Sequence, residues 1–525
     1  MKKFLENKIL HPFLITIFPA LFLYTSNLGE TKFRMAIASI MVILLISSLI
    51  VLIGGLISKN IIKSAILSSM LIFSFLSYQH FNPIFNLIGL PDSVQILYTP
   101  ISLIIWLILL LIFIYLVQKA KNLSSWNYFL NIIALILMAN IAVTLISFIL
   151  TRDSSDPEKI SDSYQSQVNV QKTTTDKMPD IYYIILDGYG RADILNSKLH
   201  FDNSPFINFL KNKKFFVADS SSSNYSQTAF SLSSSLNINY LTTVQGKKTD
   251  DRSLVGQLIA DNTVVAKLND LGYNTIGFSA NYEFAKVNNV KQNKTPAYWS
   301  EFNQVLLENS FLSDVPYIKH HLEILSLQVT SSFNNTNYIF EHIDDEALTN
   351  TPKFTFAHIL APHPPFILDK NGIRSDLDLS KITVSDGDGF FSQTHLSQKD
   401  YIDGYTRQLE YINKKAQEVI ENIISKTKRP VVIVVQGDHG SGSGTDFQNI
   451  QKTDLPERMS ILNAYYFSDQ KYDKLYPEIT PVNTFRVIFD QYFGADLPLL
   501  EDKNYFSLWN TPYEFIEVTD KVNKK

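Results

Sequence analysis

Acidic and imidazole side chains follow apolar runs in the second half of the chain. Asp187 comes directly after the run 181–186, and Asp438 and His439 come soon after the run 431–435. Charged groups at the end of a buried strand must be solvated, paired or bound to a metal. Carboxylate and imidazole together suit Zn²⁺ or Mn²⁺, with Mg²⁺ as an alternative. The pattern therefore predicts a divalent metal site.

A third apolar run, residues 354–359, contributes two histidines. His358 lies within this run, and His363 follows in a loop rich in proline. Taken singly, an acid after a strand is most often a turn or helix cap, and a histidine in such a loop is usually a surface residue. Three apolar runs that each end near carboxylate or imidazole side chains favour a common site over a set of separate caps and surface residues. The neighbouring glycines allow sharp turns close to a ligand.

A hydroxyl-rich segment, residues 220–235, is the natural place to look for a nucleophile. By composition it is a linker or a low-complexity loop. Phe230, Leu232 and Leu236, however, predict a short helix that begins near Thr228. A hydroxyl at a helix N-terminus faces free N–H groups, which suits phosphate, and a metal beside it would turn the hydroxyl into a nucleophile. Composition alone does not choose among these hydroxyls.

The apolar runs also indicate the fold that positions these groups. Continuous runs are typical of strands buried on both faces, and therefore of a mainly parallel sheet covered by helices. Residues 398–425 predict a helix, with apolar residues at i, i+4 and i+7 and with Ser397 as its N-cap. Ligands bind beyond the carboxyl ends of strands in such sheets. We expect one α/β domain over residues 179–520, with a short tail at 521–525.

The first 150 residues have a different character, because only twelve of them are charged. Five apolar stretches of about 20 residues each could cross a hydrocarbon core of about 30 Å. These stretches are residues 9–28, 36–57, 62–81, 97–117 and 128–150. Only a helix satisfies its own backbone in lipid, so we expect a five-helix transmembrane domain over residues 1–150. The polar residues 151–178 predict a connector that is either flexible or draped over the surface.

Charge placement predicts the topology. With a cytoplasmic N-terminus, seven Lys and Arg residues lie in or next to the inside loops and four in the outside segments. This bias places the N-terminus in the cytoplasm and the α/β domain outside it, as a multi-pass protein of the cell membrane. The chain carries a net charge of −4 and its second part has no basic tract, so nucleic acid is not expected as a partner. The lack of cysteine excludes a disulfide-stapled module.

The order of these motifs along the chain resembles the alkaline phosphatase/sulfatase superfamily. An Asp after the first strand is followed by Thr228 in a Thr-Ala-x-Ser segment, then by His-x4-His, and finally by Asp-His-Gly. With five apolar stretches in front, the chain looks like the membrane-anchored branch, the lipoteichoic acid synthases and phosphoethanolamine transferases. The resemblance implies an alkaline-phosphatase-like, sulfatase-type α/β domain.

The resemblance also implies roles for the residues that match. Metal ligands would be Asp187, Asp438 and His439, with the oxygen of Thr228 completing the set. Thr228 would be the nucleophile. His363 would bind the substrate phosphate or protonate the leaving group, with His358 nearby or at a second metal.

The chain departs from the phosphoethanolamine transferases in two ways. No histidine follows His439, so the second-zinc histidine of those enzymes is absent, and their disulfides are impossible here. These departures favour a single metal. Arg191, in an Arg-Ala-Asp stretch similar to theirs, is a candidate to clamp a phosphate, with a surface salt bridge as the alternative. Arg407 and Arg458 are weaker candidates for substrate binding.

Together these features predict a membrane-bound, metal-dependent phosphotransferase. It would move a phospholipid head group, of phosphoglycerol or phosphoethanolamine type, through a phospho-threonine intermediate to a glycan, lipid or polymer acceptor of the cell envelope. One alternative is a phosphodiesterase or sulfatase-type hydrolase of the same fold. A sulfatase is the less favoured of these, because the Ser-rich segment contains no Cys/Ser-x-Pro-x-Arg motif. Another alternative is an inactive membrane-anchored scaffold.

Overall fold

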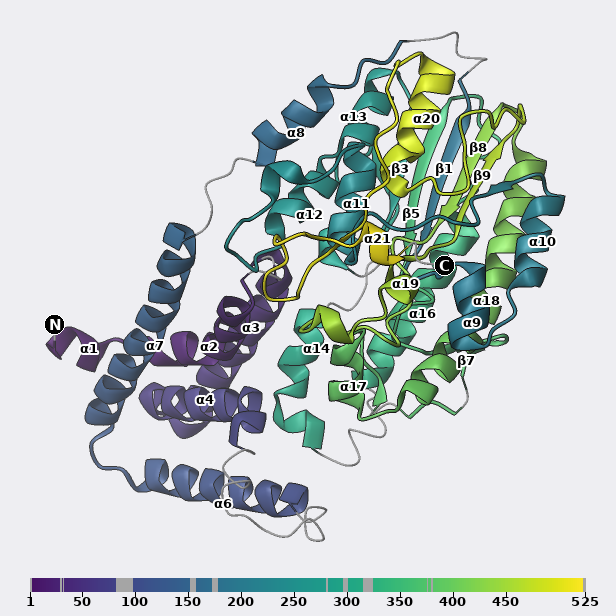
Figure 1. The fold of residues 1–525 in the computed structure, drawn as a ribbon. Helices are drawn as coiled ribbons and strands as arrows, with labels where there is room; N and C mark the ends of the chain where they lie inside the picture. The colour runs from purple at the N-terminus through teal and green to yellow at the C-terminus, as the bar shows by residue number, and fades with distance from the viewer. Residues whose placement is uncertain are drawn as a thin grey trace. The chain divides into compact units, whose positions relative to one another are not determined.

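The chain forms two compact units in the computed structural model (Figure 1). One unit comprises Met1–Arg152 and Trp299–Gln328, and the other comprises Asp153–Tyr298 and Val329–Lys525. The structure describes residues 2–28, 31, 33–81, 98–151, 157–171, 178–279, 282–295, 301–314, 324–374, 376–378 and 381–522.

The first unit, here the membrane unit, is built from apolar helices. They are α1 (Lys2–Asn7), α2 (His11–Ser26), α3 (Phe33–Ser58), α4 (Ile61–Leu76), η1 (Tyr78–Phe81), α6 (Tyr98–Lys119) and α7 (Leu123–Thr151). Among the described residues, three helices are long and apolar enough to cross a membrane, in α3, α6 and α7, whereas α2 and α4 are apolar but have only 16 residues each. Each predicted apolar stretch thus contains a helix, while the number of crossings stays a prediction.

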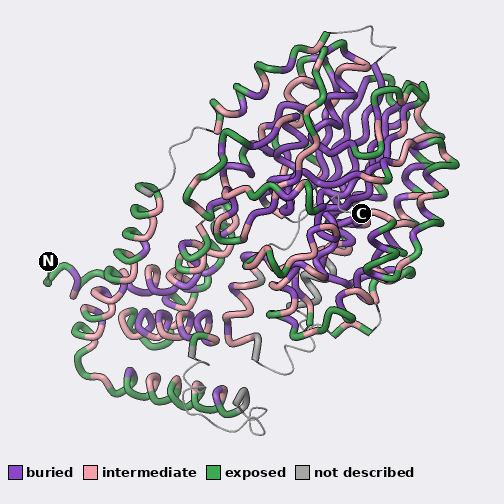
Figure 2. The backbone as a smooth tube through the Cα atoms, viewed as in Figure 1, coloured by how far each residue is buried: buried purple, intermediate pink, exposed green. Residues whose placement is uncertain are grey.

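Many large apolar residues of these helices are exposed. Figure 2 shows long exposed stretches of the backbone in α6 and α7. Leu56 is 80% exposed and Leu150 is 79% exposed. A row of exposed large apolar residues is unfavourable in water and suits contact with lipid.

The second unit, here the α/β unit, is organised around a seven-stranded sheet of order β2-β9-β8-β1-β5-β3-β4. The strands are β1 (Asp180–Leu186), β2 (Phe216–Val217), β3 (Asn274–Phe278), β4 (Gln292–Asn293), β5 (Lys353–Ile359), β8 (Val431–Gln436) and β9 (Asn463–Phe467). Pairing is parallel from β8 through β1, β5 and β3 to β4, whereas β9 runs antiparallel to β8 and β2 antiparallel to β9. The predicted mainly parallel sheet is confirmed.

Helices cover both faces of this sheet, and the central strands are buried (Figure 2). Tyr182 and Ile184 of β1 pack in one core with α9 (Ala192–Leu199), α10 (Ser204–Asn212) and α18 (Gln398–Lys426). The alternate residues of β1 pack in a second core, with α11 (Thr228–Asn237), α13 (Thr263–Asp270) and α20 (Pro481–Phe493). This alternation explains why the strand reads as one continuous apolar run.

The other described elements include further helices that pack in the cores and short strands outside the main sheet. They are α8 (Pro157–Ser166), η4 (Thr242–Val244), α12 (Ser253–Ala260), η5 (Glu283–Ala285), α14 (Glu301–Glu308), η6 (Phe311–Asp314), α16 (Ile324–His342), β6 (Leu368–Asp369), β7 (Gly372–Ile373), α17 (Asp388–Thr394), η8 (Ile450–Lys452), α19 (Leu455–Met459), β10 (Tyr505–Phe506), β11 (Ile516–Glu517) and α21 (Thr519–Val522).

Part of the connector 151–178 lies on the surface of the α/β unit. Residues 157–166 form helix α8, a helix that the sequence analysis did not predict. Ser161 Oγ donates to the carbonyl of Asp261 at 2.7 Å, and the Tyr164 hydroxyl lies 2.7 Å from Thr243 Oγ1, so this helix packs on the α/β unit. Residues 152–156 and 172–177 of the connector lie outside the described residues.

Candidate metal centre

The three motif-bearing strands are neighbours in the sheet, in the order β8-β1-β5. Asp187 follows the last residue of β1, and Asp438 and His439 follow β8 after a single glycine. Because these strands are parallel, their carboxyl ends meet at one edge of the sheet. The fold therefore brings together, at this edge, the side chains that the sequence analysis expected to find there.

Two carboxylates, one imidazole and one hydroxyl converge at this edge. Asp187, Asp438 and His439 are buried, and one ligand atom from each lies within 4.8 Å of the others. His439 Nε2 is 3.4 Å from Asp187 Oδ1 and 3.5 Å from Asp438 Oδ2. Thr228 Oγ1 lies 3.0 Å from the same nitrogen. The structure thus brings together all four residues that the resemblance implied as metal ligands.

The oxygens that face the centre of this cluster lack hydrogen-bond partners. Asp187 Oδ1 and Asp438 Oδ2 are buried without a partner in the described structure. The other oxygen of each carboxylate has a hydrogen-bond partner. His358 Nε2 lies 3.0 Å from Asp187 Oδ2, and the Gly188 amide donates to Asp438 Oδ1 at 3.0 Å. A buried carboxylate oxygen without a partner is costly unless a cation occupies the space beside it. The donor set therefore fits a divalent metal.

The imidazole of His439 is held in the form that a metal needs. Its Nδ1 lies 2.9 Å from the Gly440 carbonyl, and donation to that carbonyl leaves the lone pair on Nε2, which points into the cluster. Burial and the nearby Arg458 lower the pKa of His439, so the neutral ring is favoured. Burial by itself raises the pKa of Asp187. The charge of His363 and the hydrogen bond from His358 lower this pKa by a larger amount, so the carboxylate is ionised.

Two glycines allow the loops to pass this closely. Gly188 has φ +74°, a left-handed conformation that favours glycine. A Cβ on Gly440 would lie 2.1 Å from the Glu457 carbonyl oxygen, so a side chain there would force the two loops apart.

Thr228 is the first residue of helix α11, which confirms the predicted start of a helix. Gln227 before it is extended, so the hydroxyl lies beside the free N–H groups of the first turn. One turn later, Ser231 Oγ donates to the Asp438 carbonyl at 2.7 Å, and this bond ties the helix to the loop that carries Asp438 and His439. The Thr228 hydroxyl is thus positioned both by helix α11 and by the loop that carries Asp438 and His439.

His363 lies beside the cluster rather than in it. Its amide donates to the Asp187 carbonyl at 3.0 Å, and its ring centroid is 6.0 Å from that of His439. Its Nε2 lies 3.9 Å from Asp386 Oδ2. Burial lowers the pKa of His363, but Asp187 and Asp386 raise it more, so the net shift is upward and favours the protonated ring. A protonated imidazole at this place can donate to a phosphate or to a leaving oxygen.

Comparison with known proteins assigns the family. Residues 179–488, more than half of the chain, match the Sulfatase family. The chain belongs to the sulfatase family. This match confirms the resemblance to the alkaline phosphatase/sulfatase superfamily that the order of motifs indicated. A search of curated proteins finds no match.

Several solved structures resemble this sulfatase-family chain. The C-terminal periplasmic domain of EcEptC from Escherichia coli, in complex with zinc, gives a TM-score of 0.42 at 9% identity and covers 68% of this chain and 96% of that one. The corresponding domain of the phosphoethanolamine transferase EptC from Campylobacter jejuni gives 0.37 at 14%, covering 63% and 95%. The integral membrane lipooligosaccharide phosphoethanolamine transferase A from Neisseria meningitidis gives 0.37 at 11%, covering 92% and 95%. Since these TM-scores lie below 0.5, family membership rests on the sequence match.

The two arginines predicted as substrate ligands lie outside the metal cluster of this sulfatase-family chain. Arg191 forms a bidentate pair with Asp193 and donates to the Ser221 carbonyl at 2.9 Å, which agrees with the salt-bridge alternative. Arg407 pairs with Asp376 at 3.4 Å and lines a separate cavity of about 230 Å³. None of the four clustered residues lines that cavity, so the structure gives Arg407 no contact with the centre.

Sequence reasoning missed a second layer of residues behind the centre. Asp386 accepts from Arg458 at 2.5 Å and from the Tyr401 hydroxyl at 2.6 Å, beside His363. The Tyr405 hydroxyl donates to the Gly188 carbonyl at 2.7 Å and accepts from a nearby amide. Tyr405 lies in the predicted helix 398–425, whose spacing indicates only a buried face. No local pattern marked Asp386, because its partners are distant in sequence.

Proposed function

We propose that this protein is a membrane-bound, metal-dependent phosphotransferase that moves a phospholipid head group of phosphoglycerol or phosphoethanolamine type. The acceptor is a glycan, lipid or polymer hydroxyl of the cell envelope. The observation that carries the proposal is the convergence of two unpartnered buried carboxylate oxygens, the lone pair of His439 and the hydroxyl of Thr228.

The residues that would hold the metal are Asp187, Asp438 and His439, with the oxygen of Thr228 as a further donor. Mixed carboxylate and imidazole ligands suit Zn²⁺ or Mn²⁺, and Mg²⁺ is the alternative. When bound, a divalent ion at this place lowers the pKa of a neighbouring hydroxyl and withdraws charge from phosphoryl oxygens. The helix N-terminus of α11 adds N–H groups that stabilise the same charge.

The chain's own residues would carry two successive steps. In the first, Thr228 Oγ1 attacks the phosphorus as the deprotonated alkoxide, the bond to the diacylglycerol oxygen breaks, and protonated His363 gives a proton to that leaving oxygen. The head group is then linked to Thr228 as a phosphodiester. In the second step, neutral His363 takes the proton of the acceptor hydroxyl as that oxygen attacks the phosphorus and Thr228 leaves.

The membrane helices fit this chemistry, because the donor is itself a membrane lipid. Attachment to the bilayer raises the effective concentration of donor at the site. Lysine and arginine placement supports a cytoplasmic N-terminus, with catalysis on the opposite side of the membrane.

The test uses the purified full-length protein in vesicles that contain head-group-labelled phosphatidylglycerol or phosphatidylethanolamine, with added Mn²⁺ or Zn²⁺. We expect metal-dependent loss of label from one lipid class and its appearance on an alcohol acceptor. Thr228→Ala should abolish this transfer, whereas Thr349→Ala, which removes an exposed threonine hydroxyl, should leave it unchanged. Release of label to water alone would identify a hydrolase, and a protein that neither binds metal nor turns over any lipid would be a scaffold.

A further inference from the structure

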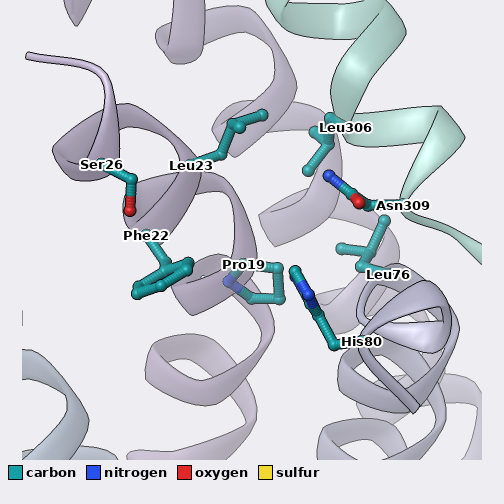
Figure 3. Close-up of a pocket in the computed structure, with 8 residues that line it drawn as sticks. All are labelled: Pro19, Phe22, Leu23, Ser26, Leu76, His80, Leu306 and Asn309. Atoms are coloured by element: carbon teal, nitrogen blue, oxygen red, sulfur yellow. The ribbon is translucent and has the colours of Figure 1, made fainter. Parts of the chain in front are cut away.

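Two cavities of the described chain differ in size. One lies in the membrane unit, where Ser26, His80 and Asn309 add polar side chains to a mainly apolar wall (Figure 3). Its volume is about 60 Å³, which suits a few water molecules, since one water needs roughly 10–15 Å³. The other is the cavity of about 230 Å³ in the α/β unit that Arg407 lines. Sites for drug-sized ligands begin at roughly 300 Å³, so this second cavity suits part of a molecule, such as one head group or sugar. We refer to it as the α18 cavity.

The α18 cavity lies between the first turns of α18 and the chain that follows His363. Phe366 and Phe390 form an aromatic part of its wall, with ring centroids 5.5 Å apart. Gly404 allows Phe366 to pack on α18, because a Cβ at that position would lie 2.7 Å from the ring. Arg374 Nη1 donates to the Phe366 carbonyl at 3.3 Å and so joins this wall to the charged part of the cavity.

Two arginines on the wall of the cavity share one carboxylate. Arg374 donates to both oxygens of Asp376 at 2.9 Å, and Arg407 Nη1 lies 3.4 Å from Asp376 Oδ2. The Asp376 side chain is 62% exposed, and the hydrogen bond from Arg374 lowers its pKa to about 2, so it is ionised. The two guanidinium groups therefore carry one more positive charge than the carboxylate between them.

The other acidic side chains on the wall have partners of their own. Asp403 lies 2.7 Å from Lys399. Asp378 lies 3.5 Å from Lys381. Asp400 accepts from a backbone amide in the capping box of α18. These carboxylates leave the excess positive charge at the two arginines, and their oxygens can accept from the hydroxyls of a ligand.

A phosphate monoester matches this excess charge better than a carboxylate does. It carries about −1.5 to −2 charges near neutral pH, and its oxygens accept bidentate hydrogen bonds from guanidinium groups. The ion pairs of Asp376 are exposed, and pairs of this kind hold only weakly in water. A phosphate group can therefore take the place of Asp376 between Arg374 and Arg407.

The chain connects this cavity closely to His363. Phe366 follows His363 by three residues, so their Cα atoms are at most about 11 Å apart. On α18, Gln408 comes directly after Arg407, and its Nε2 donates to the His363 carbonyl at 2.9 Å. A short glycan with its phosphate in the cavity can therefore bring a hydroxyl towards His363.

We propose that the α18 cavity binds the phosphate group of a phosphorylated glycan acceptor, with Arg374 and Arg407 as its ligands and Asp376 as the group that it displaces. This inference rests on the proposed function. It narrows the acceptor from any hydroxyl of the cell envelope to a glycan that already carries phosphate, and it gives Asp376 the part of a competitor for the site.

The first test measures binding rather than turnover. Radiolabelled maltose 1-phosphate and maltose are compared by equilibrium dialysis against the metal-loaded full-length protein in detergent. Arg374→Gln combined with Arg407→Gln should weaken the binding of maltose 1-phosphate about tenfold or more, because charge-assisted hydrogen bonds are lost. Asp376→Asn should strengthen it about two- to fivefold, because the phosphate no longer competes with an exposed ion pair.

Lys415→Gln is the matched control, since it removes a positive charge from the same helix outside the cavity, and it should leave binding unchanged. The metal centre is the same in the parent and in every variant, so phosphate bound there does not produce these differences. The proposal is overturned if maltose binds as tightly as maltose 1-phosphate, if the arginine double variant binds like the parent, or if Asp376→Asn binds more weakly.

The second test measures transfer of a labelled head group to the same two sugars. In the parent protein, maltose 1-phosphate should have a KM about tenfold or more below that of maltose, and the arginine double variant should lose this advantage. Transfer to both sugars with equal KM overturns the role of the cavity in acceptor binding. If the parent transfers the head group to no alcohol, the proposed function fails, while the dialysis still decides whether the cavity binds phosphate.

Discussion

His358 Nε2 lies 3.0 Å from Asp187 Oδ2, and this contact turns the other oxygen of Asp187 towards His439. Both side chains are buried, and they come from the neighbouring strand ends of β5 and β1. A group that hydrogen-bonds a metal ligand from behind fixes its orientation and tunes its affinity. His358 is therefore best placed to position Asp187 rather than to bind a second metal.

The first prediction concerns this positioning. His358→Phe keeps a ring of similar shape but removes the donor, so we expect metal affinity to fall about 10- to 100-fold. The measurement is competition with a chelator of known affinity on the purified protein. His200→Asn serves as the control, because His200 is exposed and its left-handed backbone conformation is one that asparagine tolerates. Unchanged affinity in His358→Phe would show that the contact is only structural.

A second prediction tests the acid role of His363. His363→Asn should lower transfer from a phospholipid by about 10²- to 10⁴-fold, because an alkoxide leaving group needs a proton. A p-nitrophenolate leaving group does not need one, so cleavage of a p-nitrophenyl phosphodiester should fall much less. The measurement is the rate on each of the two substrates at saturating metal, for the parent protein and for the variant. Equal losses would assign His363 to phosphate binding instead.

A third prediction concerns stability at the opposite end of the sheet. Lys353 and Asp180 form a fully buried ion pair at 2.6 Å. Among the described residues, Lys353→Met leaves Asp180 with Arg429 as its remaining cationic partner, and it should cost about 3–5 kcal/mol in the free energy of unfolding. Lys399→Met breaks the exposed pair with Asp403 and should cost less than about 1 kcal/mol. Thermal unfolding of the solubilised protein measures the loss of stability in each variant. Similar decreases in melting temperature for the two variants would contradict the larger contribution of the buried pair.

A fourth prediction concerns pH. Burial raises the pKa of Glu457, whose carboxylate accepts from the hydroxyls of Ser441 and Ser443 in the loop after His439. Since its pKa is higher in the folded than in the unfolded state, the folded state binds the proton more tightly. The free energy of unfolding should therefore fall as pH rises from the ordinary value of a glutamate through the raised one. Glu457→Gln removes this titration, so its melting temperature should fall less over that interval than the parent's. Parallel pH curves would contradict the assignment.

The sequence predicted the sheet, and it also predicted that the candidate metal ligands lie at one edge of that sheet, because both depend on local patterns. Continuous apolar runs are enough to indicate buried parallel strands, and the parallel arrangement then places Asp187 next to Asp438 and His439. The helix start at Thr228 could be found from Phe230 and Leu232, although the hydroxyl itself was chosen by resemblance.

The contacts behind the centre depend on tertiary packing and left no local signal. Asp386 meets Arg458 from a loop 72 residues away. Helix α14 was missed for a similar reason, because Phe302 and Leu306 supply only two apolar positions of a short helix. Arg407, a weaker candidate for substrate binding, lines a separate cavity, and charge and helix position alone do not show which cavity a side chain lines.

The central claim is that Thr228 carries the head group between donor and acceptor. The most direct measurement is mass spectrometry of the peptide that contains Thr228. Metal-loaded protein is first mixed with donor lipid in the absence of acceptor, and the reaction is then quenched. We expect a phosphodiester-linked head group on Thr228 that disappears when acceptor is added. Turnover without any adduct on Thr228, or turnover at the parent rate by Thr228→Ala, would contradict it.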